Sequence, residues 1–131
     1  MAAYTLNVSL DDDLDTVDPR VREALAAEGF GVLTEIDVEA TLRTKLDVEV
    51  GGYRILGACN PALAHRGLQA DPSLGALLPC NVVLRAAEGG GTEVLAVDPH
   101  AMMGVSTAPG LDAVADEVRE RLERVLATLS A

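Results

Sequence analysis

Aromatic residues are almost absent from this chain, which has one phenylalanine, two tyrosines and no tryptophan among 131 residues. Its core must therefore be aliphatic, and any ligand site has few rings on which a base or a sugar can stack. The sequence also lacks an apolar run near the ~20 residues that span a bilayer. No cationic leader with a following apolar stretch precedes the first strand-like segment. We therefore expect a soluble, cytoplasmic protein with no membrane role.

Basic residues are also scarce, with 10 of them against 21 acidic residues, and Lys45 is the single lysine. A formal net charge of −11 repels phosphate backbones and anionic headgroups, which argues against a nucleic-acid partner and against binding to a membrane surface. Hydrophobic residues make up 49% of the chain, which is ample for a core. Its length suits a single domain, residues 1–131, that buries roughly two thirds of its unfolded surface.

The rare polar residue types are concentrated in two tripeptides, Cys59-Asn60-Pro61 and Pro79-Cys80-Asn81. They hold both cysteines and two of the three asparagines of the chain. Reduced thiols are expected in the cytoplasm unless they serve redox chemistry or bind a metal. If the two tripeptides meet in space, they mark the candidate site.

Hydrophobic periodicity predicts the order β-α-β-(α)-β-α-β-β-α. The predicted strands are residues 4–10, about 30–38, 53–59, 81–86 and 92–98. The predicted helices are a first one that follows an N-cap at residue 15, 16 or 18 and ends before residue 29, and then about 40–46, 61–70 and 111–129. The last two strands are joined by a short glycine hairpin and must be antiparallel. We therefore expect an α+β, two-layer domain in which helices cover one face of a mainly antiparallel sheet.

Local signals predict finer detail at the first helix and the second strand. Pro19 belongs in the first turn of its helix, with Asp15, Thr16 or Asp18 as the N-cap, because a deeper proline removes a hydrogen bond. Gly29 is expected to end that helix in a left-handed conformation. In the second strand, alternation places Val32, Ile36 and Val38 on one face.

Cys59 directly precedes a helix that Asn60 is expected to cap and Pro61 to begin. The positive end of that helix favours a thiolate at Cys59, although free cysteine is also a common small core residue. If the strands ending at Cys59 and starting at Cys80 are antiparallel neighbours, the two thiols approach closely enough for a disulfide or shared metal ligation.

Asp98 and His100 could join Cys59 and Cys80 in a cluster of zinc-ligand types, but no ligand spacing supports such a site. The simpler interpretation is that Asp98 caps a short helix begun by Pro99. His65 is most simply a solvated residue. No Gly-x-Ser-x-Gly elbow or phosphate loop is present, so the sequence identifies no catalytic residue and no cofactor, and it favours a protein that is not an enzyme.

The chain resembles the bacterial and archaeal "domain of unknown function 302" family. The resemblance rests on Gly29-Phe30-Gly31-Val32-Leu33, Ile36-Asp37-Val38, Lys45-Leu46, Ile55-Leu56-Gly57-Ala58-Cys59-Asn60-Pro61, Leu78-Pro79-Cys80-Asn81-Val82-Val83 and Val97-Asp98-Pro99. It implies a small α+β domain that forms a homodimer and has no established activity. Its signature positions here are Cys59, Asn60, Pro61, Pro79, Cys80, Asn81, Asp98 and Pro99, with Asp37 and Lys45 as secondary members.

The leading hypothesis is a dimeric, non-enzymatic module that binds a small ligand or a partner at the two Cys-Asn motifs. The candidate ligand-binding residues are Cys59, Asn60, Pro61, Cys80, Asn81 and Asp98, with Asp37, Lys45 and His100 as secondary candidates. A second hypothesis is thiol-based redox or sulfur handling by Cys59, with Cys80 as its partner. A third is a metal site that uses the same thiols.

Overall fold

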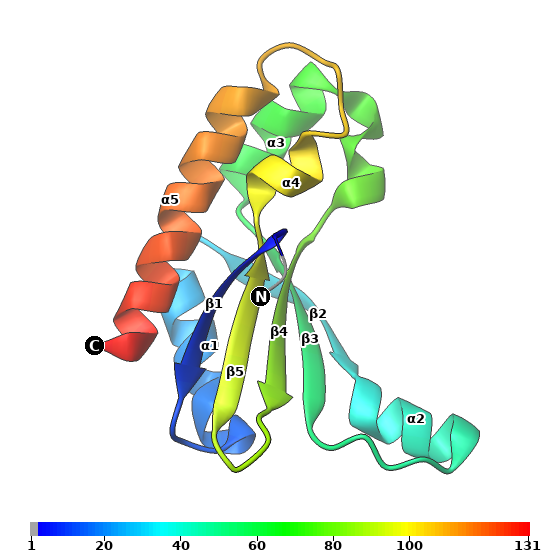
Figure 1. Cartoon of the computed structure of the whole chain (residues 1–131). Helices are drawn as coiled ribbons and strands as arrows, with labels where there is room; N and C mark the ends of the chain where they lie inside the picture. The colour runs from blue at the N-terminus through cyan, green and yellow to red at the C-terminus, as the bar shows by residue number, and fades with distance from the viewer. Residues whose placement is uncertain (1–2) are drawn as a thin grey trace.

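The computed structural model of this protein describes residues 3–131. Its strands are β1 (Thr5–Leu10), β2 (Gly31–Asp37), β3 (Tyr53–Cys59), β4 (Cys80–Ala86) and β5 (Thr92–Val97). Its helices are α1 (Leu14–Ala27), α2 (Val38–Leu46), α3 (Pro61–Ala70), the 3-10 helix η1 (Pro72–Leu77), α4 (Pro99–Met103) and α5 (Leu111–Ser130). Figure 1 shows these elements in place.

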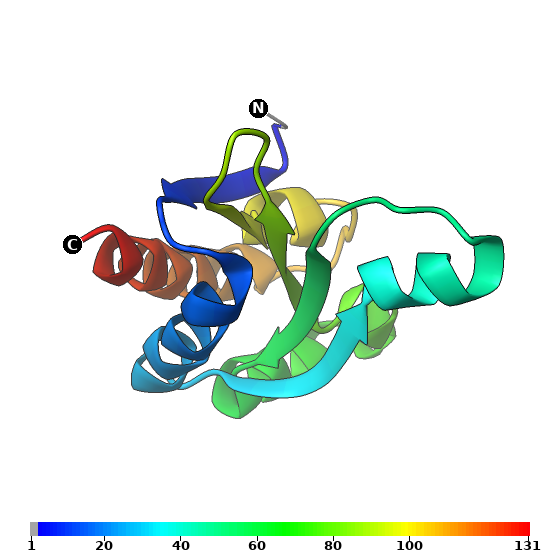
Figure 2. The ribbon, with the colours of Figure 1, turned by 90° about the horizontal axis from the view of Figure 1, so that it is seen from below.

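The five strands form one antiparallel sheet in the order β1-β5-β4-β3-β2. Helices α1, α3 and α5 cover one face of it, as the two views in Figures 1 and 2 show. The α+β class and the two-layer arrangement predicted from the sequence are confirmed. The face of the sheet that these helices leave uncovered is called the open face below.

The core lies between the sheet and α1, α3 and α5. Every second residue of the central strands points into it, including Leu56 and Ala58 of β3 and Val82 and Leu84 of β4, each with an exposed fraction of 2% or less. The apolar stripe predicted for α5 is buried along its whole length, at Leu111, Val114, Ala115, Val118, Leu122, Val125, Leu126 and Leu129. Phe30 is the only aromatic side chain in this cluster of buried residues.

The prediction for the start of α1 is wrong. The N-cap is Asp13, whose carboxylate accepts a 2.8 Å hydrogen bond from the backbone N–H of Thr16. Pro19 is therefore the sixth residue of the helix instead of part of its first turn. It forfeits one bond, to the carbonyl of Asp15 on the exposed side of the helix, where water can replace it. The predicted left-handed stop at Gly29 is confirmed by its φ of 84°.

The predicted face assignment in β2 is also wrong, because the strand contains a bulge between Val32 and Thr34. The extra residue, Leu33, reverses the alternation of the residues that follow it. Val32 pairs with the buried Ala58 on the helix side, whereas Ile36 pairs with Ile55 on the open face. Val38 has left the strand and begins α2.

Helix α2 does not join the layer formed by α1, α3 and α5. It is inserted between β2 and β3 at the sheet edge and projects away from the body of the molecule (Figures 1 and 2). Residues 38–50, which comprise α2 and the irregular stretch after it, are called the arm below. Helix α2 therefore departs from the predicted helical layer.

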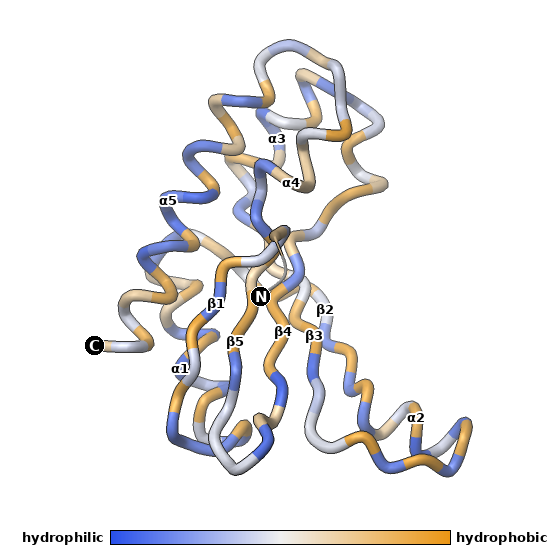
Figure 3. The backbone as a smooth tube through the Cα atoms, in the orientation of Figure 1, coloured by the Kyte–Doolittle hydropathy of each residue, from blue (hydrophilic) through white to orange (hydrophobic). Residues whose placement is uncertain are grey.

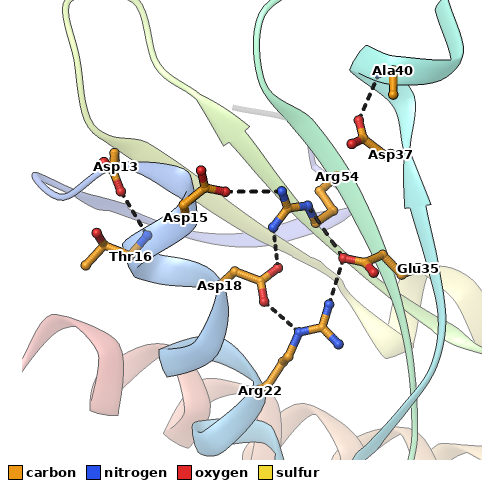
Figure 4. A network of polar contacts seen from close by, with 9 residues as sticks. All are labelled: Asp13, Asp15, Thr16, Asp18, Arg22, Glu35, Asp37, Ala40 and Arg54. Atoms are coloured by element: carbon orange, nitrogen blue, oxygen red, sulfur yellow. Dashed lines mark hydrogen bonds and ion pairs between the residues drawn. The ribbon is translucent and has the colours of Figure 1, made fainter.

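A network of ion pairs fastens α1 to the strands β2 and β3 (Figure 4). The Asp18 carboxylate accepts from Nε of Arg22 at 2.6 Å and from Nη1 of Arg54 at 2.7 Å, and Arg22 also reaches Glu35 at 2.9 Å. Burial acts to raise the pKa of Asp18, but the hydrogen bonds and charges of Arg22 and Arg54 outweigh it and hold that pKa below its ordinary value of 3.8. Asp18 is therefore ionised in the folded protein at neutral pH.

Candidate functional site

The alternation of β4 separates the two halves of the Pro79-Cys80-Asn81 motif. Cys80, Val82 and Leu84 point into the helix-covered core, so Asn81, Val83 and Arg85 lie on the open face. Asn60 lies at the helix side, at the start of α3. Asn60 and Asn81 are thus on opposite sides of the sheet, and the structure does not bring the two amides together.

Cys59 and Cys80 do come together. The pairing of β3 with β4 places Ala58 opposite Cys80, and both cysteines line one small cavity with Asn60 and apolar residues that include Phe30 and Leu63. The cavity has a volume of about 20 Å³, which is room for about one water molecule. It is too small for an organic ligand. Both thiols are free.

The two thiols differ in their surroundings. Cys80 is buried, whereas Cys59 is half-buried. Burial, with a smaller contribution from nearby Cys59, raises the pKa of Cys80 to about 11 from an ordinary value of 9.0. Cys80 is consequently a protonated core thiol at physiological pH.

This difference predicts selective alkylation. Iodoacetamide at pH 8 is expected to label Cys59 and to leave Cys80 unlabelled until the protein is denatured, because a buried thiol that stays protonated is both inaccessible and unreactive. Peptide mass spectrometry of native and denatured samples measures each site separately. Labelling of Cys80 in native protein as fast as Cys59 would contradict this account.

Asn60 serves the fold. Its side-chain oxygen accepts from the backbone N–H of Leu63 at 3.3 Å, as expected of an N-cap, and Pro61 follows as the first residue of α3. Its Nδ2 donates at 3.4 Å to the carbonyl of Glu28, which also accepts from Arg121 at 2.9 Å. Asn60 therefore joins the start of α3 to the end of α1.

Asp98 and His100 do not line the cysteine cavity, and each interacts with residues outside it. Asp98 caps α4 through the N–H of His100 and forms an ion pair with Arg119, which confirms the simpler interpretation of this residue. The His100 Nε2 lies 2.9 Å from a carboxylate oxygen of Asp116. Over residues 3–131 no three or more histidine, cysteine, aspartate or glutamate side chains are grouped to hold a metal ion, so the four-residue cluster suggested by the sequence does not form.

The other two secondary candidates lie at the two ends of α2. Asp37 precedes α2 and caps it, accepting at 2.9 Å from the backbone N–H of Ala40. Lys45 lies in the last turn of the same helix and is exposed. Neither residue lines the cysteine cavity.

The open face carries apolar residues that a solvated sheet face does not need. Strand register aligns one residue from each strand in a row across its centre: Asn7, Leu95, Val83, Ile55 and Ile36. Four of these five are aliphatic, and such a row on an uncovered face makes this face a candidate interaction surface. Figure 3 shows apolar residues along the strands and again in the arm.

A hollow of about 540 Å³ lies on this face. This cavity is called the hollow below. The residues that line it are Tyr4, Thr5, Tyr53, Asn81, Val83, Arg85, Leu95 and Val97. The volume falls in the range of ~300–1,000 Å³ typical of small-molecule sites. Both tyrosines of this aromatic-poor chain line it.

The hollow has an apolar floor and polar ends. Asn81 and Arg85 are four residues apart on β4, which is about 13 Å along a strand, and Val83 lies between them. Tyr53 pairs with Arg85 at one end. Nη1 of Arg85 donates a hydrogen bond to Oε1 of Glu93 at 2.8 Å. The guanidinium has further N–H donors besides this one.

Sequence reasoning identified Asn81 but missed the rest of the hollow. One signal was available, since Asn81, Val83 and Arg85 alternate with the core residues Cys80, Val82 and Leu84. The tyrosines gave no such signal, because Tyr4 and Tyr53 are far apart in the chain and only the sheet order brings them to one face.

The fold and its open-faced sheet define a small α+β module, and comparison with known proteins places it in a family. Residues 6–129 match the domain of unknown function DUF302, and the chain belongs to this family. A solved structure, the "uncharacterized conserved protein DUF302 from Bacillus stearothermophilus", is 29% identical over 98% of this chain and 99% of that chain, with a TM-score of 0.89. No curated protein matches the chain. Within residues 3–131, every helix is too short or too polar to cross a bilayer.

Proposed function

We propose that this protein is a non-enzymatic small-ligand-binding module whose site is the hollow on the open face of the sheet. The observation that carries the proposal is the hollow itself: about 540 Å³ with an aliphatic floor and polar groups at both ends. The cysteine cavity, at about 20 Å³, has no comparable capacity. Asn81 is the member of the Cys-Asn motifs that takes part directly.

The chemistry of the lining selects the ligand class. Val83, Leu95 and Val97 suit an elongated apolar body, and Arg85 suits one carboxylate, sulfonate or phosphate at its end. A polyanion is disfavoured because the chain carries a formal net charge of −11. The ligand we expect is therefore a mostly apolar molecule with a single anionic group.

Binding of anilinonaphthalene sulfonate, an apolar ring system with one anionic group, tests this proposal. We expect Arg85→Gln to weaken the binding of this dye about tenfold. The substitution removes one charge-assisted hydrogen bond, and a loss of about 1.4 kcal/mol of binding free energy raises the dissociation constant tenfold. Arg66→Gln is the matched control, since Arg66 is equally exposed, at 47% against 46%, and is likewise paired with one glutamate. Fluorescence titration of the wild type and both variants measures the dissociation constants.

Equal weakening by the two substitutions would show that the dye responds only to surface charge, and it would contradict the proposal. Absence of dye binding to the folded wild type would contradict it as well. Unchanged thermal unfolding of both variants is the check that the fold is intact.

The thiol hypothesis has less support than the ligand-binding proposal. A thiol pair in redox use needs at least one accessible thiolate and a partner that can react with it. Cys80 is buried and its pKa is raised to about 11, which opposes that role.

We further propose a cytoplasmic location, with which two free cysteines agree, and a homodimeric state.

A further inference from the structure

The arm is left without a packing partner. None of the nine residues of α2 is buried, and an isolated helix shorter than ~12 residues is marginal in water. Of the eight large hydrophobic side chains that are exposed over residues 3–131, five lie between residues 33 and 50. Leu46, Val48 and Val50 of the arm have exposed fractions of 65%, 40% and 49%.

The same molecule carries an apolar surface that its own arm does not cover. The hollow is apolar and open, while the arm projects beyond the sheet edge (Figures 1 and 2). When one chain presents both a protruding apolar arm and an apolar hollow, a two-fold axis lets the arm of each copy cover the hollow of the other copy. The occupant indicated by this self-complementarity is a second copy of the chain.

Charge complementarity supports that occupant. Beside the hollow, and sharing Tyr53 with it, lies a groove of about 260 Å³ that is called the acidic groove below. Four carboxylates and one guanidinium line it: Asp13, Asp15, Asp37, Glu39 and Arg54. Lys45, the only lysine of the chain, immediately precedes Leu46 at the end of α2. An arm that places Leu46 near Tyr53 brings this cation to the acidic groove.

The acidic groove also lies at the base of the arm, since Asp37 caps α2 and Glu39 is in its first turn. Lys45 and Leu46 lie at the opposite end of the helix. In a two-fold pair in which each arm lies on the hollow of the other copy, the end of each arm reaches the acidic groove next to that hollow. One arrangement thus satisfies the apolar and the charged contacts in both copies at once.

We infer that two copies of this chain exchange arms, so that Leu46 and Val48 of each arm cover the hollow of the other copy and Lys45 enters its acidic groove. The arm then forms the outer wall of the ligand site, and each site is complete only in the dimer. That last step rests on the proposed function. The contact between arm and hollow stands on its own observations.

Complementation between two variants tests the contact. We expect sedimentation equilibrium to show a wild-type dimer, and monomers for the arm variant Leu46→Asp and for the hollow variant Val83→Arg. An equal mixture of the two is expected to form a heterodimer, because the intact arm of one fits the intact hollow of the other. Leu68→Asp is the control, since Leu68 is an exposed leucine on α3 and lies outside both surfaces.

Lys45→Glu changes an exposed side chain, so it is not expected to unfold the protein. Circular dichroism checks that the Leu46→Asp, Val83→Arg and Leu68→Asp variants are folded. Repulsion from the acidic groove is expected to weaken the dimer about tenfold. A monomeric wild type, a dimeric Leu46→Asp variant or an unaffected Lys45→Glu dimer would overturn the inference. A mixture that stays monomeric would also overturn it. A Val83→Arg variant that stays dimeric would overturn it as well, and would indicate that arms pair with arms.

Dye binding separates the two proposals. Leu46→Asp is expected to weaken the binding of anilinonaphthalene sulfonate severalfold, whereas Leu68→Asp leaves it unchanged. Equal binding to the wild type and Leu46→Asp would overturn the closing role of the arm and leave the ligand site standing. A wild-type dimer that passes the complementation test and binds no dye would overturn the ligand site and support the arm contact.

Discussion

Replacement of Asp18 by alanine is expected to lower the free energy of unfolding by about 3 kcal/mol, because it removes the shared acceptor of two arginines. The Asp18 side chain is only 12% exposed, and the Arg54 side chain that faces it is 21% exposed. Chemical unfolding measures the change. Asp15→Ala is the matched control, since Asp15 contacts the same Arg54 at 3.3 Å but is 88% exposed, and it should change stability by less than about 0.5 kcal/mol.

The effect of Asp18 is also expected to depend on pH. Its folded-state pKa is lowered, so its contribution is fully present above the unfolded-state pKa and is lost as the pH falls through the folded-state pKa. The stability difference between the wild type and Asp18→Ala should thus be constant near neutral pH and shrink below about pH 4. A difference that grows on acidification, or an Asp15→Ala variant as unstable as Asp18→Ala, would contradict the network.

Gly57→Ala is expected to lower the free energy of unfolding by about 2 to 3 kcal/mol through overpacking. A Cβ at this position would fall on the hydroxyl of Thr34 and lie 2.8 Å from Cγ of Pro79. Threonine can change its rotamer, but the proline ring is fixed at the start of the strand that carries Cys80 and Asn81. The substitution therefore pushes β3 away from the start of β4, where Asn81 lines the hollow.

Gly31→Ala is the control for this substitution. Gly31 is also a strand glycine, it has no positive φ, and no heavy atom lies within 4 Å of the position that its Cβ would take. Its replacement should change the free energy of unfolding by less than about 0.5 kcal/mol. If urea denaturation finds the two alanine variants equally stable, the close approach of Pro79 to Gly57 is wrong.

The elements that could be predicted are those whose signals are local. Tyr53–Cys59 matches the predicted third strand residue for residue, and Asn60 followed by Pro61 marked the start of α3. The eight-residue apolar stripe of α5 repeats at helical spacing from Leu111 to Leu129, which leaves no alternative to a helix packed on the core.

The predictions that were wrong involve one extra residue or a competing cap. Leu33 adds a residue to β2, and no turn signal in the sequence marks that bulge. At α1, Asp13 captures the N–H of Thr16, so the helix starts before Pro19 despite the cost of one hydrogen bond.

The candidate site could be predicted only in part, because it depends on which face each strand residue takes. The sequence predicted that Cys59 lies beside Cys80 if β3 and β4 are antiparallel neighbours, and the structure shows that pairing. Strand alternation places Asn81 and Cys80 on opposite faces of the sheet. The sequence-based prediction nevertheless put them in one site, because it relied on the clustering of rare residue types in the two tripeptides. The link from Arg54 to Asp18 spans 36 positions, and it has no signal before the fold is known.

The most direct test of the central claim is a map of backbone amide shifts in ¹⁵N-labelled protein on titration with anilinonaphthalene sulfonate. The account predicts that the largest changes fall on Tyr53, Asn81, Val83, Arg85 and Leu95 of the open face. Changes confined to the residues of the cysteine cavity, Cys59, Asn60, Leu63 and Cys80, would contradict it and return the binding site to the Cys-Asn motifs.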